Sequence, residues 1–193
     1  MRVRRLDGAE IASTLPRLAE LRIEVFRAYP YLYDGALEYE RDYLDQFAKA
    51  RAATLVAAFD GANIVGCATA SALSDQHAEF AAPLRAASYD LNNIYYFGES
   101  VLLPDYRGRG IGHAFFNHRE AAARAHGFAS ACFCAVRRPE DHPLKPVDYS
   151  PLDPFWTARG YRKLEGLTAW FDWRDIDKPE PDEKPMDYWM REL

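Results

Sequence analysis

Apolar side chains recur every three to four residues in several segments of the chain, a spacing that predicts helices with one buried face. The first such segment runs to about residue 28 and begins after Asp7, which forms a capping-box pair with Glu10. Pro30 and Gly35 interrupt the helical pattern, because both residue types oppose helix continuation. In chain order, the predicted helices are the one ending near residue 28, one that carries Leu37, Leu44 and Phe47 on a single side, residues 110–126 and residues 155–159.

Runs rich in β-branched, aromatic and small apolar residues predict strands between these helices. Asp60-Gly61 connects two of them, since this dipeptide accepts the positive φ angles of a tight hairpin turn. Residues 75–93 lack a clear period and are expected to form an irregular insertion, with one helical turn around residues 83–88. The predicted strands are residues 3–6, 54–59, 63–72, 95–103, 128–136, 168–172 and 186–191.

Composition and charge narrow the class of protein. The chain has 193 residues, which suffices for one well-buried core and is short for two, so a single domain over residues 1–193 is expected. A net charge of -5 argues against nucleic-acid or anionic-membrane partners, which favour a basic face. No apolar run approaches the roughly 18 residues of a spanning helix. The chain has three cysteines, too few and too scattered for a dense disulfide framework, which fits the reducing interior of a cell. A cytoplasmic location is therefore expected.

The junction from strand to helix at residues 99–113 carries the clearest chemical signal. A helix start leaves backbone N–H groups without partners and carries roughly half a positive charge. Glycines at alternate positions bring the backbone close to an anion, and the arginines between them add charge. The loop reads Arg107-Gly108-Arg109-Gly110-Ile111-Gly112. It is therefore expected to bind a phosphate or diphosphate.

Two nucleotide-binding motifs are excluded at this junction. A P-loop needs Gly-Lys followed by Ser or Thr, whereas this loop continues Gly112-His113-Ala114. A dinucleotide-binding loop needs its third glycine at position 113 and an acidic residue roughly 20 positions further on. The chain is apolar in that second region.

The loop fits a different signature. Arg107, Gly110 and Gly112 occupy the fixed positions of Arg/Gln-x-x-Gly-x-Gly/Ala. In this motif, and in the order of its elements over nearly the whole chain, the sequence resembles the GCN5-related N-acetyltransferase (GNAT) superfamily. The resemblance implies an α/β fold of the α+β type, with about four helices around a mixed, mostly antiparallel sheet of about seven strands. It also implies transfer of an acetyl group from acetyl-CoA, the co-substrate, to an amine, with no metal.

The resemblance further implies where acetyl-CoA binds. The backbone at residues 100–102 would pair with the pantetheine arm as an added strand would, and the amides of residues 108–113 would hold the diphosphate. The implied binding residues are Ser100, Val101, Leu102, Arg107, Gly108, Arg109, Gly110, Ile111, Gly112 and His113.

Glu99 is the candidate general base. Only about one lysine-like amine in a thousand is neutral at pH 7, so a positioned base accelerates attack. Family members often place a glutamate on this strand, and the aromatic residues before Glu99 would shield it from water. The alternative is a structural carboxylate bonded to nearby backbone or to Arg137. A backbone N–H of Val101 or Leu102 would stabilise the oxyanion.

The general acid is where the sequence departs from the family. Trp156 stands four residues before the closing Gly160, where the family often has a tyrosine. Tyr149 is the candidate substitute, and Tyr161, water and the acceptor amine are alternatives. Because tryptophan is not a useful proton donor, Trp156 also favours an alternative function, a non-catalytic coenzyme A-binding sensor or interaction module of the same fold.

Two segments are candidates for contact with the acceptor, which is expected to be a small-molecule amine. Tyr29, Tyr31 and Tyr33 lie between the first two helices, where the family builds part of its acceptor pocket, and they either receive an apolar or cationic acceptor or seal the helix pair. Residues 137–154 contain five prolines. They form either a lid, with Arg137 or Arg138 near a phosphate, or a stiff surface loop.

The aromatic residues near the C-terminus are expected to pack on the sheet. An exposed final strand among them would allow a homodimer through edge pairing. These residues are Trp170, Phe171, Trp173, Tyr188 and Trp189.

Overall fold

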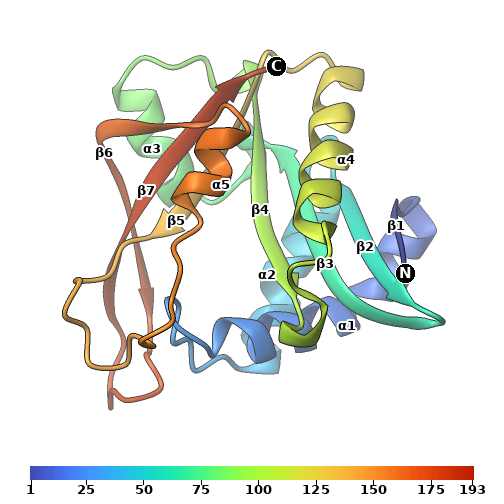
Figure 1. Cartoon of the computed structure of the whole chain (residues 1–193). Helices are drawn as coiled ribbons and strands as arrows, with labels where there is room; N and C mark the ends of the chain where they lie inside the picture. The colour runs from blue at the N-terminus through green and yellow to red at the C-terminus, as the bar shows by residue number, and fades with distance from the viewer.

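Seven strands form one mixed sheet with helices on both faces (Figure 1). The computed structural model describes all 193 residues. Along the sheet the strands run in the order β1-β2-β3-β4-β5-β7-β6, and β4–β5 is the parallel pair in an otherwise antiparallel arrangement. The strands are β1 (Arg2–Arg5), β2 (Thr54–Asp60), β3 (Asn63–Ala72), β4 (Ile94–Leu102), β5 (Ser130–Val136), β6 (Arg162–Trp173) and β7 (Asp182–Glu192).

Five α-helices and three short 3-10 turns connect these strands. The helices are α1 (Gly8–Phe26), α2 (Leu37–Lys49), α3 (Ala78–Ala86), α4 (Ile111–Ala125) and α5 (Asp153–Ala158). The 3-10 turns are η1 (Leu73–Asp75), η2 (Leu91–Asn93) and η3 (Pro104–Tyr106). The fold class predicted from the resemblance is therefore confirmed. No helix combines the length and the apolar character needed to cross a bilayer.

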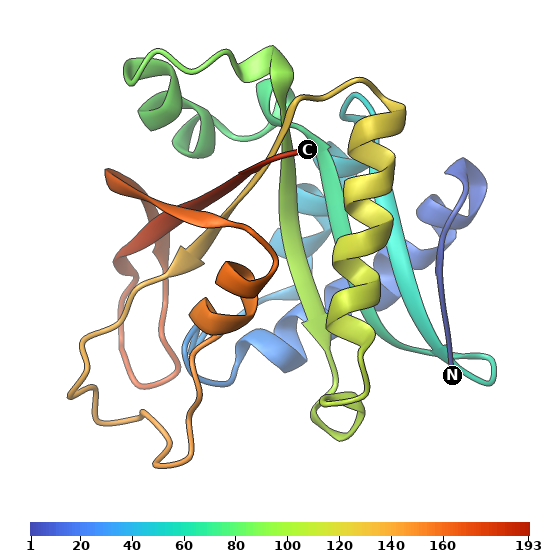
Figure 2. The same ribbon diagram turned by 45° about the horizontal axis from the view of Figure 1, so that its top comes forward.

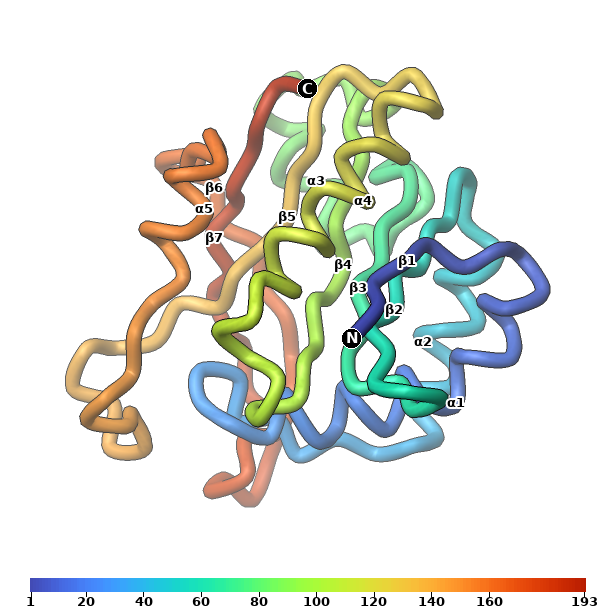
Figure 3. The backbone as a smooth tube through the Cα atoms, turned by 45° about the vertical axis from the view of Figure 1, so that its right-hand side comes forward, coloured from blue at the N-terminus to red at the C-terminus, as the bar shows by residue number.

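Alternation along the strands sends side chains to two different helical layers. Leu55 and Ala57 of β2 pack with α1 and α2, whereas Val56 and Ala58 pack with α4. Figure 3 shows these two layers on either side of β2 and β3. The capping box that begins α1 is present, with Asp7 accepting from the backbone N–H of Glu10 at 3.0 Å.

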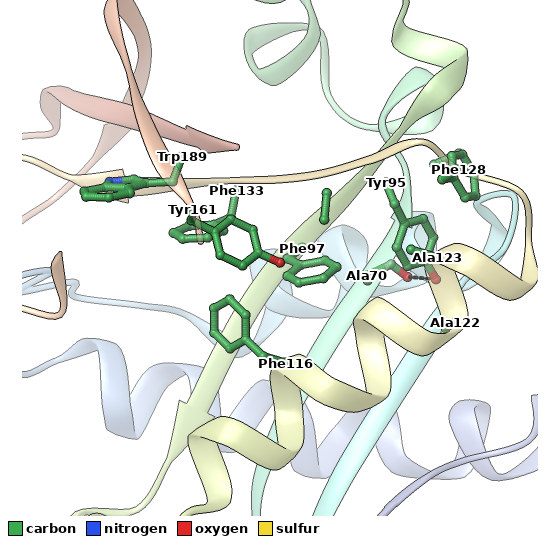
Figure 4. Packing of buried hydrophobic residues seen from close by; sticks show 12 residues of the cluster. Ala70, Tyr95, Phe97, Phe116, Ala122, Ala123, Phe128, Phe133, Tyr161 and Trp189 are labelled. Atoms are coloured by element: carbon green, nitrogen blue, oxygen red, sulfur yellow. Dashed lines mark hydrogen bonds between the residues drawn. The ribbon is translucent and has the colours of Figure 1, made fainter. Parts of the chain in front are cut away.

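Aromatic rings join α4 and α5 to the second half of the sheet (Figure 4). Phe116 of α4 lies against Tyr161 with ring centroids 5.3 Å apart and against Phe133 of β5 at 5.8 Å. Trp156 of α5 packs on Phe133 at 5.1 Å and on Trp189 at 5.2 Å. This packing places α5 beside the start of α4, across the sheet from α1 and α2.

Three of the expectations about the elements are wrong. Residues 75–93 contain a full helix, α3, because the burial of Phe80, Ala81 and Leu84 in a core cluster outweighs the opposition of Pro83. The last strand, β7, is internal, because β6 pairs on its outer side, so β1 and β6 are the edges and edge pairing through the final strand is excluded. Trp170 does not pack on the sheet, since it is 50% exposed.

Neighbouring strands β4 and β5 separate along their length. They pair only from Ile94 to Tyr96, opposite Ser130 to Cys132, and then diverge (Figure 2). The edge of β4 beyond residue 96 therefore has no strand beside it on the β5 side. The sheet is thus splayed between these two strands.

Candidate functional site

A β-bulge in β4 determines where Glu99 points. Opposite Thr69 of β3, β4 has two residues, Gly98 and Glu99, where a regular ladder has one. A Cβ at position 98 would lie 2.5 Å from Thr69 Oγ1, so glycine is the residue that fits. The same Oγ1 accepts from the backbone N–H of Glu99 at 3.3 Å. The extra residue reverses the alternation of the strand, so Phe97 faces α4, whereas Glu99 and Val101 face α1.

Glu99 forms a buried cluster with one arginine and a second carboxylate. Arg22 of α1 donates through Nη1 to Glu99 and through Nε to Glu40 of α2. The side chain of Glu99 is 2% exposed and that of Glu40 is 0% exposed. Burial opposes the charge of Arg22, but both carboxylates, together with the nearby Tyr43, outweigh it and raise the pKa of Arg22 above its ordinary value.

Two carboxylate oxygens of this cluster, Glu40 Oε1 and Glu99 Oε1, are left without a partner, and of these two residues Glu99 lines a cavity. Glu99 Oε1 is buried and accepts no hydrogen bond from the protein. A buried acceptor in this state is unfavourable by about 1–3 kcal/mol unless another donor reaches it. The proposed alternative partner of Glu99, Arg137, lies elsewhere and pairs with Asp187 at 2.9 Å. That part of the sequence-based alternative is wrong.

Beside Glu99 lies a cavity of about 500 Å³, which we call the aromatic cavity. It is bounded by α1, α2 and the loop between them, by α3 and by strands β4 to β7, and 13 of its 21 lining residues are hydrophobic. Tyr31 and Tyr33 line it, and burial raises the pKa of both phenols. Glu99 and Tyr96 are among its most buried lining residues, and Tyr39 and Trp170 are among its most exposed.

Tyr29 and Tyr149 lie outside the lining of the aromatic cavity. Their rings meet edge to face with centroids 4.7 Å apart, and Tyr29 also lies 5.8 Å from the ring of His142. Tyr29 therefore packs against the proline-rich loop and contributes no surface to the aromatic cavity. Burial, and then Tyr29 and Asp153, raise the pKa of Tyr149, so its phenol is protonated at neutral pH.

The predicted anion loop has the geometry that an anion site needs. Gly108 and Gly110 have φ angles of 71° and 79°, and a Cβ built on either would meet nothing within 4 Å. The backbone N–H groups from residue 108 to His113 donate to no acceptor within the protein. Arg107 and Arg109 are exposed beside them. Free amides, open space and positive charge fit a diphosphate at the start of α4.

Arg119 ties α4 to the bulge of β4, and the sequence reasoning missed it. Its guanidinium donates to the carbonyl oxygens of Thr69 and Glu99, both at 3.2 Å, and to Ser100 Oγ at 2.8 Å. It lies over the ring of Phe97, 4.3 Å from the centroid. Since it has no ion-pair partner, burial lowers the pKa of Arg119 to about 10.

Two further candidates have structural roles. Tyr161 donates to Glu120 at 3.1 Å inside the α4–α5 core, which excludes it as a proton donor to a ligand. Arg138 is 6% exposed and paired with Asp175 at 2.6 Å, so the idea that it contacts a phosphate is wrong. No group of three His, Cys, Asp or Glu side chains is placed to hold a metal ion.

Comparison with known proteins identifies the family. A model of the acetyltransferase (GNAT) family matches residues 16–146. The chain belongs to the GNAT acetyltransferase family. A search of curated proteins finds no significant match.

Solved structures of GNAT proteins share the fold at low sequence identity. One similar structure is the ribosomal-protein-alanine N-acetyltransferase of Brucella melitensis, with a TM-score of 0.63, 11% identity and full coverage of both chains. A Salmonella typhimurium protein assigned as an acetyltransferase was solved with acetyl-CoA; its TM-score is 0.58 at 11% identity, with 100% of this chain and 94% of that chain covered. An aminoglycoside 6'-N-acetyltransferase in complex with coenzyme A has a TM-score of 0.58 at 15% identity, with 100% and 97% covered.

Proposed function

We propose that the protein is an acetyl-CoA-dependent N-acetyltransferase that modifies a small-molecule amine by direct transfer. The observation that carries this proposal is Glu99 Oε1, a buried acceptor without a partner at the aromatic cavity. Glu99 belongs to the part of β4 that has no strand beside it on the β5 side. Acetyl-CoA supplies an acetyl group activated as a thioester. Starting from the ammonium form of the acceptor, the reaction joins its nitrogen to the acetyl carbon, breaks the carbon–sulfur bond, and releases coenzyme A as its thiol together with one proton.

The open edge of β4 and the loop before α4 would hold acetyl-CoA. The backbone of Ser100, Val101 and Leu102 offers hydrogen-bonding groups along the splay, and the free amides of residues 108–113 suit the diphosphate. Backbone N–H groups alternate along a strand. Because the N–H of Leu103 bonds to Val65 on β3, that of Leu102 points to the open edge. Leu102 is thus favoured over Val101 as the donor to the oxyanion.

Glu99 would accept the proton of the incoming amine. Its free oxygen is oriented by the bond that Arg22 makes to the other oxygen, so the base is held in one position. Tyr149 is our candidate for returning a proton to the departing thiolate, because its phenol is protonated and the residue comes four positions before α5 in the chain.

The test is the Glu99→Gln variant, assayed by release of coenzyme A thiol and by calorimetry with coenzyme A. We expect coenzyme A affinity to be unchanged and kcat to fall by about 10²–10⁴-fold, the usual contribution of a positioned base. Glu165→Gln, an exposed carboxylate on β6, is the control. If turnover of Glu99→Gln stays within a few-fold of wild type across pH, Glu99 is not the base.

A second variant tests the proton donor. We expect Tyr149→Phe to lower kcat with little change in either KM; an unchanged kcat would assign the proton to water or to the acceptor amine. The partly buried Trp156, which lies where the family often has a tyrosine, favours the non-catalytic alternative. Tight coenzyme A binding with no turnover on any amine would support that alternative.

A further inference from the structure

The lining of the aromatic cavity is unusual in how much of it is ring surface. Ten of its 21 lining residues carry a phenyl, phenol or indole ring, and few aliphatic side chains contribute. Phe80 of α3 lies with its centroid 4.1 Å from that of Phe171 and 4.6 Å from that of Tyr96. Tyr31 packs within 6.0 Å of Trp173. Ring-lined walls of this kind favour a flat apolar ligand, which can stack or meet them edge to face.

The charges at the aromatic cavity favour a cation. Four carboxylates line it, against two guanidiniums. Arg174 forms an ion pair with Asp34. Arg22 forms ion pairs with Glu99 and with Glu40, and Glu40 is not part of the cavity lining. The other two lining carboxylates, those of Glu79 and Asp172, have no ion-pair partner.

We propose that the acceptor is an arylalkylamine: a primary amine joined by a short chain to an aromatic ring, without a carboxylate beside the amine. Its nitrogen would reach Glu99 Oε1, and its ring would lie against Phe171 and Trp173. The unpartnered carboxylates Glu79 and Asp172 would attract the ammonium form as it enters. This inference rests on the proposed acetyltransferase function.

Other classes of amine fit the same cavity less well. An amino acid would bring its own carboxylate next to Glu99, where Arg22 already holds two carboxylates. An aminoglycoside would bury hydroxyl groups against rings that cannot bond them, at about 1–3 kcal/mol for each unpaired group. The ammonium groups of a polyamine would pair with the carboxylates of the cavity, but its alkyl chain has no ring to stack on the aromatic walls.

The experiment compares amines that differ by one feature, using the wild-type protein at saturating acetyl-CoA and thiol release as the readout. L-phenylalanine and 2-phenylethylamine differ only in a carboxylate, and hexylamine has a chain of similar size without a ring. We expect kcat/KM for 2-phenylethylamine to exceed that for hexylamine by about tenfold, the upper range of a ring–ring contact. It should exceed that for L-phenylalanine by about 100-fold or more, because like charges repel in a partly buried site.

Two variants check which residues produce the preference. Phe171→Leu keeps apolar bulk and removes a ring, so the ratio between 2-phenylethylamine and hexylamine should fall several-fold while KM for acetyl-CoA is unchanged. Glu79→Gln should raise KM for the amine, with less effect at high salt. Glu165→Gln removes an exposed carboxylate away from the cavity and should change neither value.

The outcomes separate this inference from the proposed function. A higher kcat/KM on spermidine, kanamycin, L-phenylalanine or a short peptide, or equal rates with hexylamine, would overturn the arylalkylamine assignment and leave the acetyltransferase function standing. No turnover with any amine, despite coenzyme A binding, would overturn both.

Discussion

Replacing Arg22 by methionine would leave two buried carboxylates without a counter-ion. Arg22 is the only cation paired with Glu40 and Glu99, whose side chains are 0% and 2% exposed. Breaking a buried pair by removing one partner destabilises proteins by about 3–5 kcal/mol, because an uncompensated charge remains in a medium of low polarity. That is a large part of the roughly 5–15 kcal/mol by which a domain is stable. We expect Arg22→Met to lower the free energy of unfolding by about 3–5 kcal/mol.

Urea unfolding followed by tryptophan fluorescence measures the loss. With a denaturant slope of about 2 kcal/mol/M, the unfolding midpoint should fall by about 1.5–2.5 M. The decisive comparison repeats Arg22→Met in a Glu40→Gln/Glu99→Gln background, where the substitution leaves no buried carboxylate without a counter-ion. There the same substitution should cost less than about 1 kcal/mol or be stabilising, since it removes an unpaired buried cation.

The difference between the two backgrounds isolates the electrostatic coupling from the packing of the side chain. Arg22 also lies over the rings of Tyr43 and Phe26, at 4.3 Å and 5.2 Å from their centroids, and these contacts are lost in both backgrounds. An equal cost in the two backgrounds would therefore refute the charge argument and assign the effect to packing.

Three further predictions concern other parts of the fold. Gly110→Ala forces an alanine into φ 79°, so it should lower stability in thermal unfolding by about 1–2 kcal/mol and weaken coenzyme A binding in calorimetry. Gly8→Ala, which has the same open space at a helix start, should change neither stability nor binding. Equal effects of the two substitutions would refute the strain argument. Burial raises the pKa of Cys67 to about 12, above its value in the unfolded chain. The contribution of the neutral thiol to folding stability is therefore complete below about pH 8.5 and is lost as pH rises through 12. Between about pH 9 and 11 the unfolding midpoint of wild type should fall more than that of Cys67→Ala, and equal slopes would contradict this. Asp7→Ala removes the cap of α1 and should cost about 1 kcal/mol, with an unchanged midpoint as the contrary result.

Elements with a strong period or a defined turn could be predicted from the sequence. β2 and β3 begin at residues 54 and 63, where their apolar runs predict, and the hairpin between them turns at Gly61, which has φ 59°. The anion loop could also be predicted, because its geometry is local: glycines and a helix start lie within six residues. β6 is longer than predicted, since it begins at Arg162 and continues past an irregular register near Gly166 that interrupts the alternation.

The buried arginines show what periodicity misses when polar residues are assumed to face solvent. Arg22 lies four residues after Leu18, on the apolar stripe of α1, and this position could have identified a buried charge in need of partners. In α4, His118 and Arg119 both follow Phe115 at helical spacing, and Arg119 is the buried one of the two. The partners of both arginines come from elements distant in sequence, which no local pattern specifies.

The bulge at Gly98 allows one strand to serve two sites at once. Without the extra residue, alternation would turn Glu99 toward α4, with Phe97, and Arg22 would have no second carboxylate. With it, the side chain of Glu99 reaches the aromatic cavity, while its carbonyl oxygen and Ser100 bond to Arg119 on the opposite face. The position of the candidate base therefore depends on a register difference between β3 and β4, which a single added methyl group at residue 98 would disturb.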